Sequence, residues 1–145
     1  MEQTKKKKIL NIQSIVGIIA GVGAMIFVQQ FFFSAPTFDK AMMQAAGELN
    51  KSCPIMVDSE TRLDNAVTLP ENIFQYNYTL ITAQKDSLNI EALQAYIEPR
   101  LINTVKTTPE LKPYRDNKVT MAYQYKDKNG VFLFKVLVTP DKYKE

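Results

Sequence analysis

The sequence contains no histidine and no tryptophan, and Cys53 is its only cysteine. It therefore has no imidazole base, no set of Cys and His ligands for a metal ion, and no pair of cysteines for an intramolecular disulfide. A hydrolase that relies on carboxylates alone is the least favoured of the functions considered. The composition predicts a non-enzymatic protein without a metal or another cofactor.

The chain also lacks a surplus of positive charge outside its first residues. The formal net charge of +3 comes entirely from residues 1–8, where four lysines stand against Glu2. Residues 37–145 carry 14 basic and 14 acidic residues, so their formal charges cancel. Nucleic-acid binding normally needs excess Lys and Arg to displace counterions from phosphate. The charge pattern therefore argues against nucleic acid as a partner.

One long uncharged run is present, because residues 9–33 contain no charged side chain. At about 1.5 Å per residue, roughly 20 helical residues cross the ~30 Å hydrocarbon core of a bilayer. The run predicts a transmembrane helix over 9–33. The alternative is a cleaved signal peptide, which has an apolar core of about 7–15 residues and small residues at the cleavage site. Phe33, Ser34 and Ala35 before Pro36 fit that chemistry poorly.

The flanks of this run predict its orientation. Four lysines precede it, whereas residues 34–52 contain only Lys40 and Lys51. Since positive residues stay in the cytoplasm, we expect residues 1–8 to be a cytoplasmic tail. Residues 34–36 are then a linker, and 37–145 form an extracytoplasmic domain of a single-pass protein in the cytoplasmic (inner) membrane.

Small residues recur along one face of the predicted membrane helix. Gly17, Ala20, Gly21 and Ala24 lie at helical spacing, and residues 17–21 form a GxxxG motif. Such residues let two helix backbones approach closely, which predicts a homodimer through this helix. The alternative is chance, since glycine is common in membrane helices.

Residues 37–145 alternate polar and apolar side chains, as expected of a small globular domain. Thr37 can cap a helix that Pro54 ends, and a second helix can begin at Asp86 or Ser87. Pro99 predicts a kink or a restart in the second helix. The order α-β-β-α-β-β predicts an α+β fold with two layers, helices on an antiparallel sheet. Four strands are expected, within residues 62–69, 74–81, 119–126 and 131–139.

Period-two spacing predicts which strand residues are buried. Leu63, Val67 and Leu69 are expected on one face of the first strand. In the second strand the alternating residues are Phe74, Tyr76, Tyr78 and Leu80. The tyrosines could instead form a stacking platform for sugars or bases, but their spacing favours packing in the core.

The last two strands read as a hairpin whose turn is Asn129-Gly130. This turn pairs Tyr125 with Phe134, and it places Leu133 and Leu137 together on the opposite face. Leu133 and Leu137 could form a surface for a protein partner. The alternative is that a helix covers them.

Two further groups could carry chemistry. Asp58, Glu60 and Asp64 are close in sequence, but the segment lacks the glycine of a calcium loop and places Arg62 where an oxygen ligand is needed. A surface charge network or a capped turn is the better interpretation. Cys53 has no histidine to activate it, so it is expected to be an inert thiol or to link two chains.

Three stretches carry a resemblance to known sequences: NKSCPIMVDSETRLDN (50–65), FQYNYTL (74–80) and YIEPRLINTVKTTPELKPYRDNKVTMAYQYKDKNGVFLFKV (96–136). They resemble a set of small, uncharacterised bacterial proteins. The resemblance implies a bacterial source and a location in the cell envelope, without an activity. The small pilotin-like assembly factors of secretion systems are a more distant analogy; those are usually lipoproteins, and this chain lacks their lipid-bearing cysteine.

Together these features predict a membrane-anchored, non-enzymatic protein whose extracytoplasmic domain binds a protein partner or assists envelope assembly. The alternative is an extracytoplasmic domain that binds a small ligand or a peptide and is released by signal cleavage. Neither interpretation identifies the partner.

Overall fold

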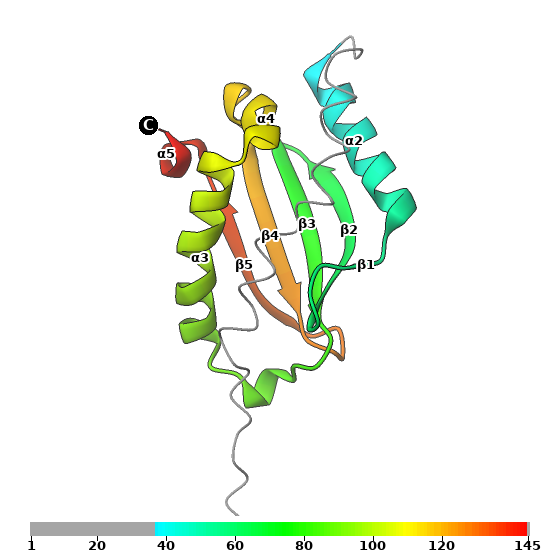
Figure 1. The fold of residues 1–145 in the computed structure, drawn as a ribbon, viewed down its shortest axis with the longest axis vertical. Coiled ribbons are helices and arrows are strands. Elements are labelled where there is room, and N and C mark those ends of the chain that lie inside the picture. The colour runs from blue at the N-terminus through cyan, green and yellow to red at the C-terminus, as the bar shows by residue number, and fades with distance from the viewer. Residues whose placement is uncertain (1–36, 145) are drawn as a thin grey trace, which may run out of the picture.

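The computed structural model describes residues 37–144, which form one five-stranded sheet and the helices around it (Figure 1). The chain begins with the helix α2 (Phe38–Ser52) and continues with three strands, β1 (Ile55–Met56), β2 (Thr61–Leu69) and β3 (Ile73–Leu80). A short η3 turn (Lys85–Ser87) leads to the long helix α3 (Ile90–Thr107). The remaining elements are η4 (Pro109–Leu111), α4 (Lys112–Asp116), β4 (Thr120–Lys126), β5 (Phe132–Val138) and α5 (Pro140–Tyr143).

The sheet is mixed, which corrects the predicted antiparallel α-β-β-α-β-β fold. Its strands lie in the order β1-β2-β3-β4-β5, and β3 and β4 run parallel while the other neighbours are antiparallel. The reason is that α3 forms a crossover between β3 and β4, and such a connection brings the next strand back in the same direction. The short elements β1, α4 and α5 were also absent from the predicted order.

Both long helices pack against the same face of the sheet. In Figure 1, α2 lies beside β2 and α3 beside β5, with α4 and α5 at one end of the sheet and the turn between β4 and β5 at the other. One hydrophobic cluster joins the two helices to this face. It contains Met42 and Leu49 of α2, Ile97 and Leu101 of α3, and the inward residues of the strands.

The helix ends follow their capping chemistry. Thr37 accepts a hydrogen bond from the backbone N–H of Lys40, as predicted for the start of α2. The second helix begins later than predicted, since Asn89 caps α3 through the N–H of Ala92. Pro99 lies inside α3, which continues without a restart, and the alternative of a kink stays a prediction.

A bulge changes which residues of β2 face the core. The register shifts between Leu63 and Asn65, so Leu63 and Ala66 are buried, whereas Val67 and Leu69 are only half-buried. An extra residue in one strand reverses the alternation beyond it. The predicted inward residues of β3 are confirmed, because Phe74, Tyr76, Tyr78 and Leu80 are all buried. Gln75 and Thr79 between them are buried as well.

The predicted membrane helix over 9–33 lies outside the described residues. Within residues 37–144 there is no helix long and apolar enough to cross a membrane. The transmembrane, single-pass and inner-membrane assignments are therefore not supported by the described part of the chain. The homodimer through Gly17, Ala20, Gly21 and Ala24 depended on the same helix, and these four residues also lie outside the described part.

The turn between β4 and β5 is organised by the buried carboxylate of Asp127. Its Oδ1 accepts from the N–H groups of Asn129 (2.8 Å) and Val131 (2.9 Å), and its Oδ2 accepts from that of Lys85 (3.0 Å). Burial raises the pKa of Asp127, but these three N–H donors and the charge of Lys128 outweigh it, so the net pKa lies below 3.8. Gly130 has a φ of 79°, a conformation that glycine adopts without strain. The turn is longer than the predicted Asn129-Gly130 turn, because the N–H of Gly130 donates to the carbonyl oxygen of Asp127 and the N–H of Asp127 donates to that of Val131.

We expect Asp127→Asn to destabilise the protein at neutral pH by removing a charged acceptor from these three donors. The pKa of Asp127 is lower in the folded protein than its unfolded value of 3.8, so its charge stabilises the fold fully at a pH above 3.8. This stabilisation is lost as the pH falls through the folded pKa. The difference in urea midpoint between wild type and variant should therefore narrow as the pH falls from about 7 to about 2.5. The exposed neighbour Asp86 is the control. Asp86→Asn should give a difference that is small at every pH, and a constant difference for Asp127→Asn would contradict this role.

Candidate functional site

The structure separates the two leucines that were predicted to form a partner surface. Leu133 is 5% exposed and belongs to the core, whereas Leu137 is 40% exposed. The cause is a bulge, because Tyr125 pairs with Phe134 as predicted but Lys126 pairs with Phe132. Phe132, 50% exposed, therefore stands on the outer face where Leu133 was expected. Partner binding through Leu133 and Leu137 stays a prediction.

The acidic cluster forms a capped turn and a polar network. Oδ1 of Asp58 accepts from the N–H groups of Glu60 (2.7 Å) and Thr61 (2.8 Å), which closes the turn between β1 and β2. Asp64 binds the side chains of Arg62 and Thr79 on the outer face. Over residues 37–144, no three His, Cys, Asp or Glu side chains are placed to hold a metal ion.

Cys53 is a half-buried thiol. Burial raises its pKa, and the nearby carboxylate of Asp64 raises it further. Since the thiolate is the reactive form, both effects lower the reactivity of this cysteine.

The tyrosines of β3 and β4 are packed in the core, as their spacing predicted. Tyr76 stacks on Tyr123 with ring centroids 5.5 Å apart, and Tyr78 stacks on Tyr125 at 5.2 Å. Burial raises the pKa of all four phenols, so they stay protonated and uncharged. These rings stabilise the fold and do not form an exposed platform for sugars or bases.

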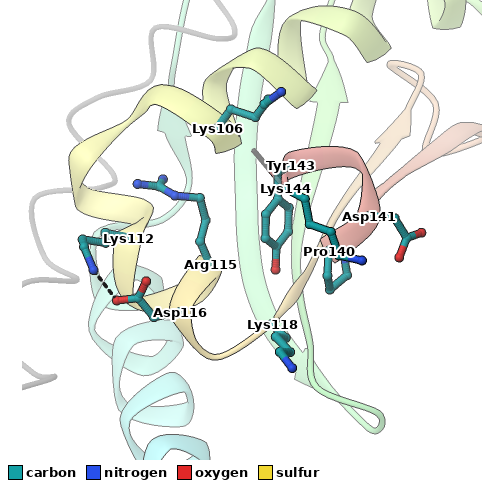
Figure 2. A pocket seen from close by; sticks show the side chains of 9 residues that line it. All are labelled: Lys106, Lys112, Arg115, Asp116, Lys118, Pro140, Asp141, Tyr143 and Lys144. Carbon is teal, nitrogen blue, oxygen red and sulfur yellow. Dashed lines mark hydrogen bonds and ion pairs between the residues drawn. The ribbon is translucent and has the colours of Figure 1, made fainter.

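A basic pocket of about 710 Å³ is present at the end of the domain where α3, α4 and α5 meet (Figure 2). Five of its lining residues are basic: Lys106, Lys112, Arg115, Lys118 and Lys144. The other lining residues are Asp116, Pro140, Asp141 and Tyr143. With five cations and two carboxylates, the lining has a formal charge of +3. It is the strongest candidate for a functional site in the described residues.

The lysines of the pocket differ in their partners. The ammonium group of Lys112 pairs with the carboxylate of Asp116 one helical turn later, a contact drawn in Figure 2. Lys106, Lys118 and Lys144 are exposed, and within residues 37–144 their ammonium groups form no hydrogen bond or ion pair. The pocket thus holds three cations that have no counter-charge in direct contact.

Arg115 is held in place by the end of α3. Its Nη1 donates to the carbonyl oxygens of Val105 and Thr108, each at 2.7 Å. A cation at a helix C-terminus satisfies carbonyl groups that have no partner within the helix. The two bonds fix the guanidinium group and leave its Nε and Nη2 without an acceptor in the described residues.

Side chains from distant segments hold the other walls by donating hydrogen bonds to backbone carbonyl oxygens. The side-chain amide of Asn72, in the turn between β2 and β3, donates to the carbonyl oxygens of Asn117 (2.8 Å) and Lys118 (3.2 Å). The hydroxyl of Tyr143 donates to the carbonyl oxygen of Val119 at 2.7 Å, which ties α5 to the start of β4. The pocket is therefore formed by the fold without a ligand.

The pocket was not predicted from the sequence. The formal charges of residues 37–145 sum to zero, and this sum conceals where the charges lie. A local count gives the signal, since residues 106–118 contain four basic residues against Glu110 and Asp116. The contribution of Lys144 could not be found in this way, because only the tertiary structure brings it to α4.

We expect Tyr143→Phe to lower the free energy of unfolding by about 1–2 kcal/mol, because the buried carbonyl of Val119 loses its donor while the ring is kept. Urea denaturation followed by circular dichroism measures this change. Tyr96→Phe is the matched control, since the Tyr96 hydroxyl forms no hydrogen bond in the described part of the chain. Equal stability of Tyr143→Phe and wild type would contradict the role of this bond.

Comparisons with known proteins identify the fold and the family. The structure resembles a candidate secreted protein from Pseudomonas aeruginosa, with a TM-score of 0.62, 9% identity, and coverage of 72% of this chain and 91% of the other. It also resembles EpsS, a pilotin of the type 2 secretion system of Vibrio vulnificus, with a TM-score of 0.53, 12% identity, and coverage of 72% and 89%. AspS, a type II secretion system pilotin from Vibrio cholerae, gives a TM-score of 0.51, 13% identity, and coverage of 70% and 87%.

These findings confirm both resemblances predicted from the sequence. No curated protein is significantly similar to the sequence. A family model described as "Domain of unknown function (DUF8479)" matches residues 37–134, which is most of the described domain. The chain belongs to this family, DUF8479.

Proposed function

We propose that residues 37–144 form a non-enzymatic binding domain that assists the assembly of a secretion or envelope complex by binding a protein partner. The observation that carries the proposal is the similarity to two pilotins of type II secretion systems, which extends over 89% and 87% of their chains. At 12% and 13% identity, this similarity concerns the fold, and a function on that basis is an analogy.

The chemistry of the described residues supports binding over catalysis. The four stacked phenols are buried and protonated, and Cys53 is a weakly reactive thiol. Most of the charged groups that line the basic pocket are cations. Cations of this kind can hold an anionic partner, but charged ammonium and guanidinium groups only donate hydrogen bonds and have no lone pair with which to accept a proton.

The same pocket favours a second candidate, a domain that binds a small anionic ligand. Its volume of about 710 Å³ lies within the range of about 300–1,000 Å³ that is typical of ligand sites. A small anion would neutralise the pocket without any role in assembly. The two functions therefore differ in whether loss of the protein changes an envelope complex.

Deletion of the gene in its source bacterium tests the proposal. We expect less assembled type II secretion complex in native gels of envelope fractions, and less of its exported substrates in the medium. A plasmid copy should restore both, and an unrelated outer-membrane porin should assemble normally as the control. Normal assembly and export in the deletion strain, with every other envelope complex also intact, would contradict a role in assembly.

A further inference from the structure

We infer that the basic pocket binds an acidic segment of the partner protein, a stretch with several neighbouring Asp or Glu side chains. This inference deepens the proposed function, on which it rests, by naming the chemistry of the partner. It follows from the charge, the geometry and the shape of the pocket.

The pocket concentrates positive charge in a domain whose formal charges cancel overall. Its lining has a formal charge of +3, so the rest of the domain carries an equal excess of acidic residues elsewhere. Three of its cations, Lys106, Lys118 and Lys144, have no counter-charge in direct contact within the described residues. Cations that share a concave surface raise the local concentration of anions and are stabilised when an anion binds.

Arg115 gives the pocket a preference for carboxylates. Because its Nη1 is used by Val105 and Thr108, the guanidinium edge that contains Nε and Nη2 is left for a ligand. The two N–H groups along such an edge match the two oxygens of a carboxylate. Since the group is already fixed, little further entropy is lost when the ligand binds.

The size and shape of the pocket favour a peptide segment over the alternatives. A volume of about 710 Å³ exceeds what a single small anion fills, and it can take several side chains. The cations line a concavity between three helices, whereas a bilayer presents a nearly flat layer of headgroups. A protruding acidic chain reaches all of these groups at once.

A binding assay with the full-length chain tests this inference. The probe is a fluorescein-labelled peptide of six glutamates, and binding is measured by fluorescence anisotropy at about 50 mM salt, where exposed charges are weakly screened. The control peptide has six glutamines. We expect saturable binding of the glutamate peptide alone, with an affinity that falls as salt is added.

The double variant K118E/K144E should weaken binding of the glutamate peptide by about tenfold or more, because it reverses two cations in the pocket. The matched control is K40E/K51E, which makes the same change of charge on exposed residues of α2 that do not line the pocket. The control should keep the wild-type affinity. Circular dichroism verifies that both variants are folded.

Several outcomes would overturn the inference. They are equal binding of the two peptides, an equal loss of affinity in both double variants, and saturation by inorganic phosphate at concentrations where the glutamate peptide does not bind. Binding to vesicles of phosphatidylcholine and phosphatidylglycerol without peptide binding would assign the pocket to a lipid surface instead. The assay is independent of assembly in cells. If the peptide binds but the deletion strain secretes normally, only the role in assembly is refuted. If secretion is lost in the deletion strain but the peptide does not bind, only the inference of an acidic segment is refuted.

Discussion

The parallel pairing of β3 with β4 is the contact on which the rest of the structure depends. It joins the part of the chain before α3 to the part after it, and each half brings one antiparallel hairpin to the sheet. Along this pair, Tyr76 lies opposite Tyr123 and Tyr78 opposite Tyr125, with both pairs of rings stacked. Such aromatic pairs contribute about 0.5–1.5 kcal/mol each beyond the area that they bury. The register of the central strands is thus fixed by side chains as well as by the backbone.

This pairing also creates the basic pocket. To return from the end of β3 to the start of a parallel β4, the chain must run the length of the sheet along α3 and turn through α4. The turn brings Arg115 against the last carbonyl groups of α3. The end of β5 lies at the same end of the sheet as α4, so α5 and the residue after it bring Tyr143 and Lys144 to the pocket. The core and the pocket are therefore consequences of one topology, although they have opposite chemistry.

The two faces of the sheet differ in what they can contribute to binding. The inner face is covered by the helices and filled with aromatic rings. The outer face carries a network of side-chain hydrogen bonds on β2 and β3, which joins Gln75 to Asn77 and Asn77 to Asn65. Its exposed large apolar residues on β5 are Phe132 and Leu137. The concentrated charge lies on neither face but at the end of the domain, where loops and helix ends meet.

Local sequence patterns determined much of this protein. Rules that act over a few residues predict the cap at Thr37, the position of the hairpin between β4 and β5, and the inward tyrosines, and the structure confirms these three features. Tertiary structure decided what depends on long-range geometry. It set the direction of β4 relative to β3, the bulges that turned Leu133 inward and changed the pattern after Leu63, and the placement of Lys144 in the same pocket as Arg115. A strand of given alternation can pair in either direction, and a single extra residue exchanges its two faces. Charges distant in sequence are likewise brought together only when the elements between them have packed, which is why a sum of charges over the chain could not reveal the pocket.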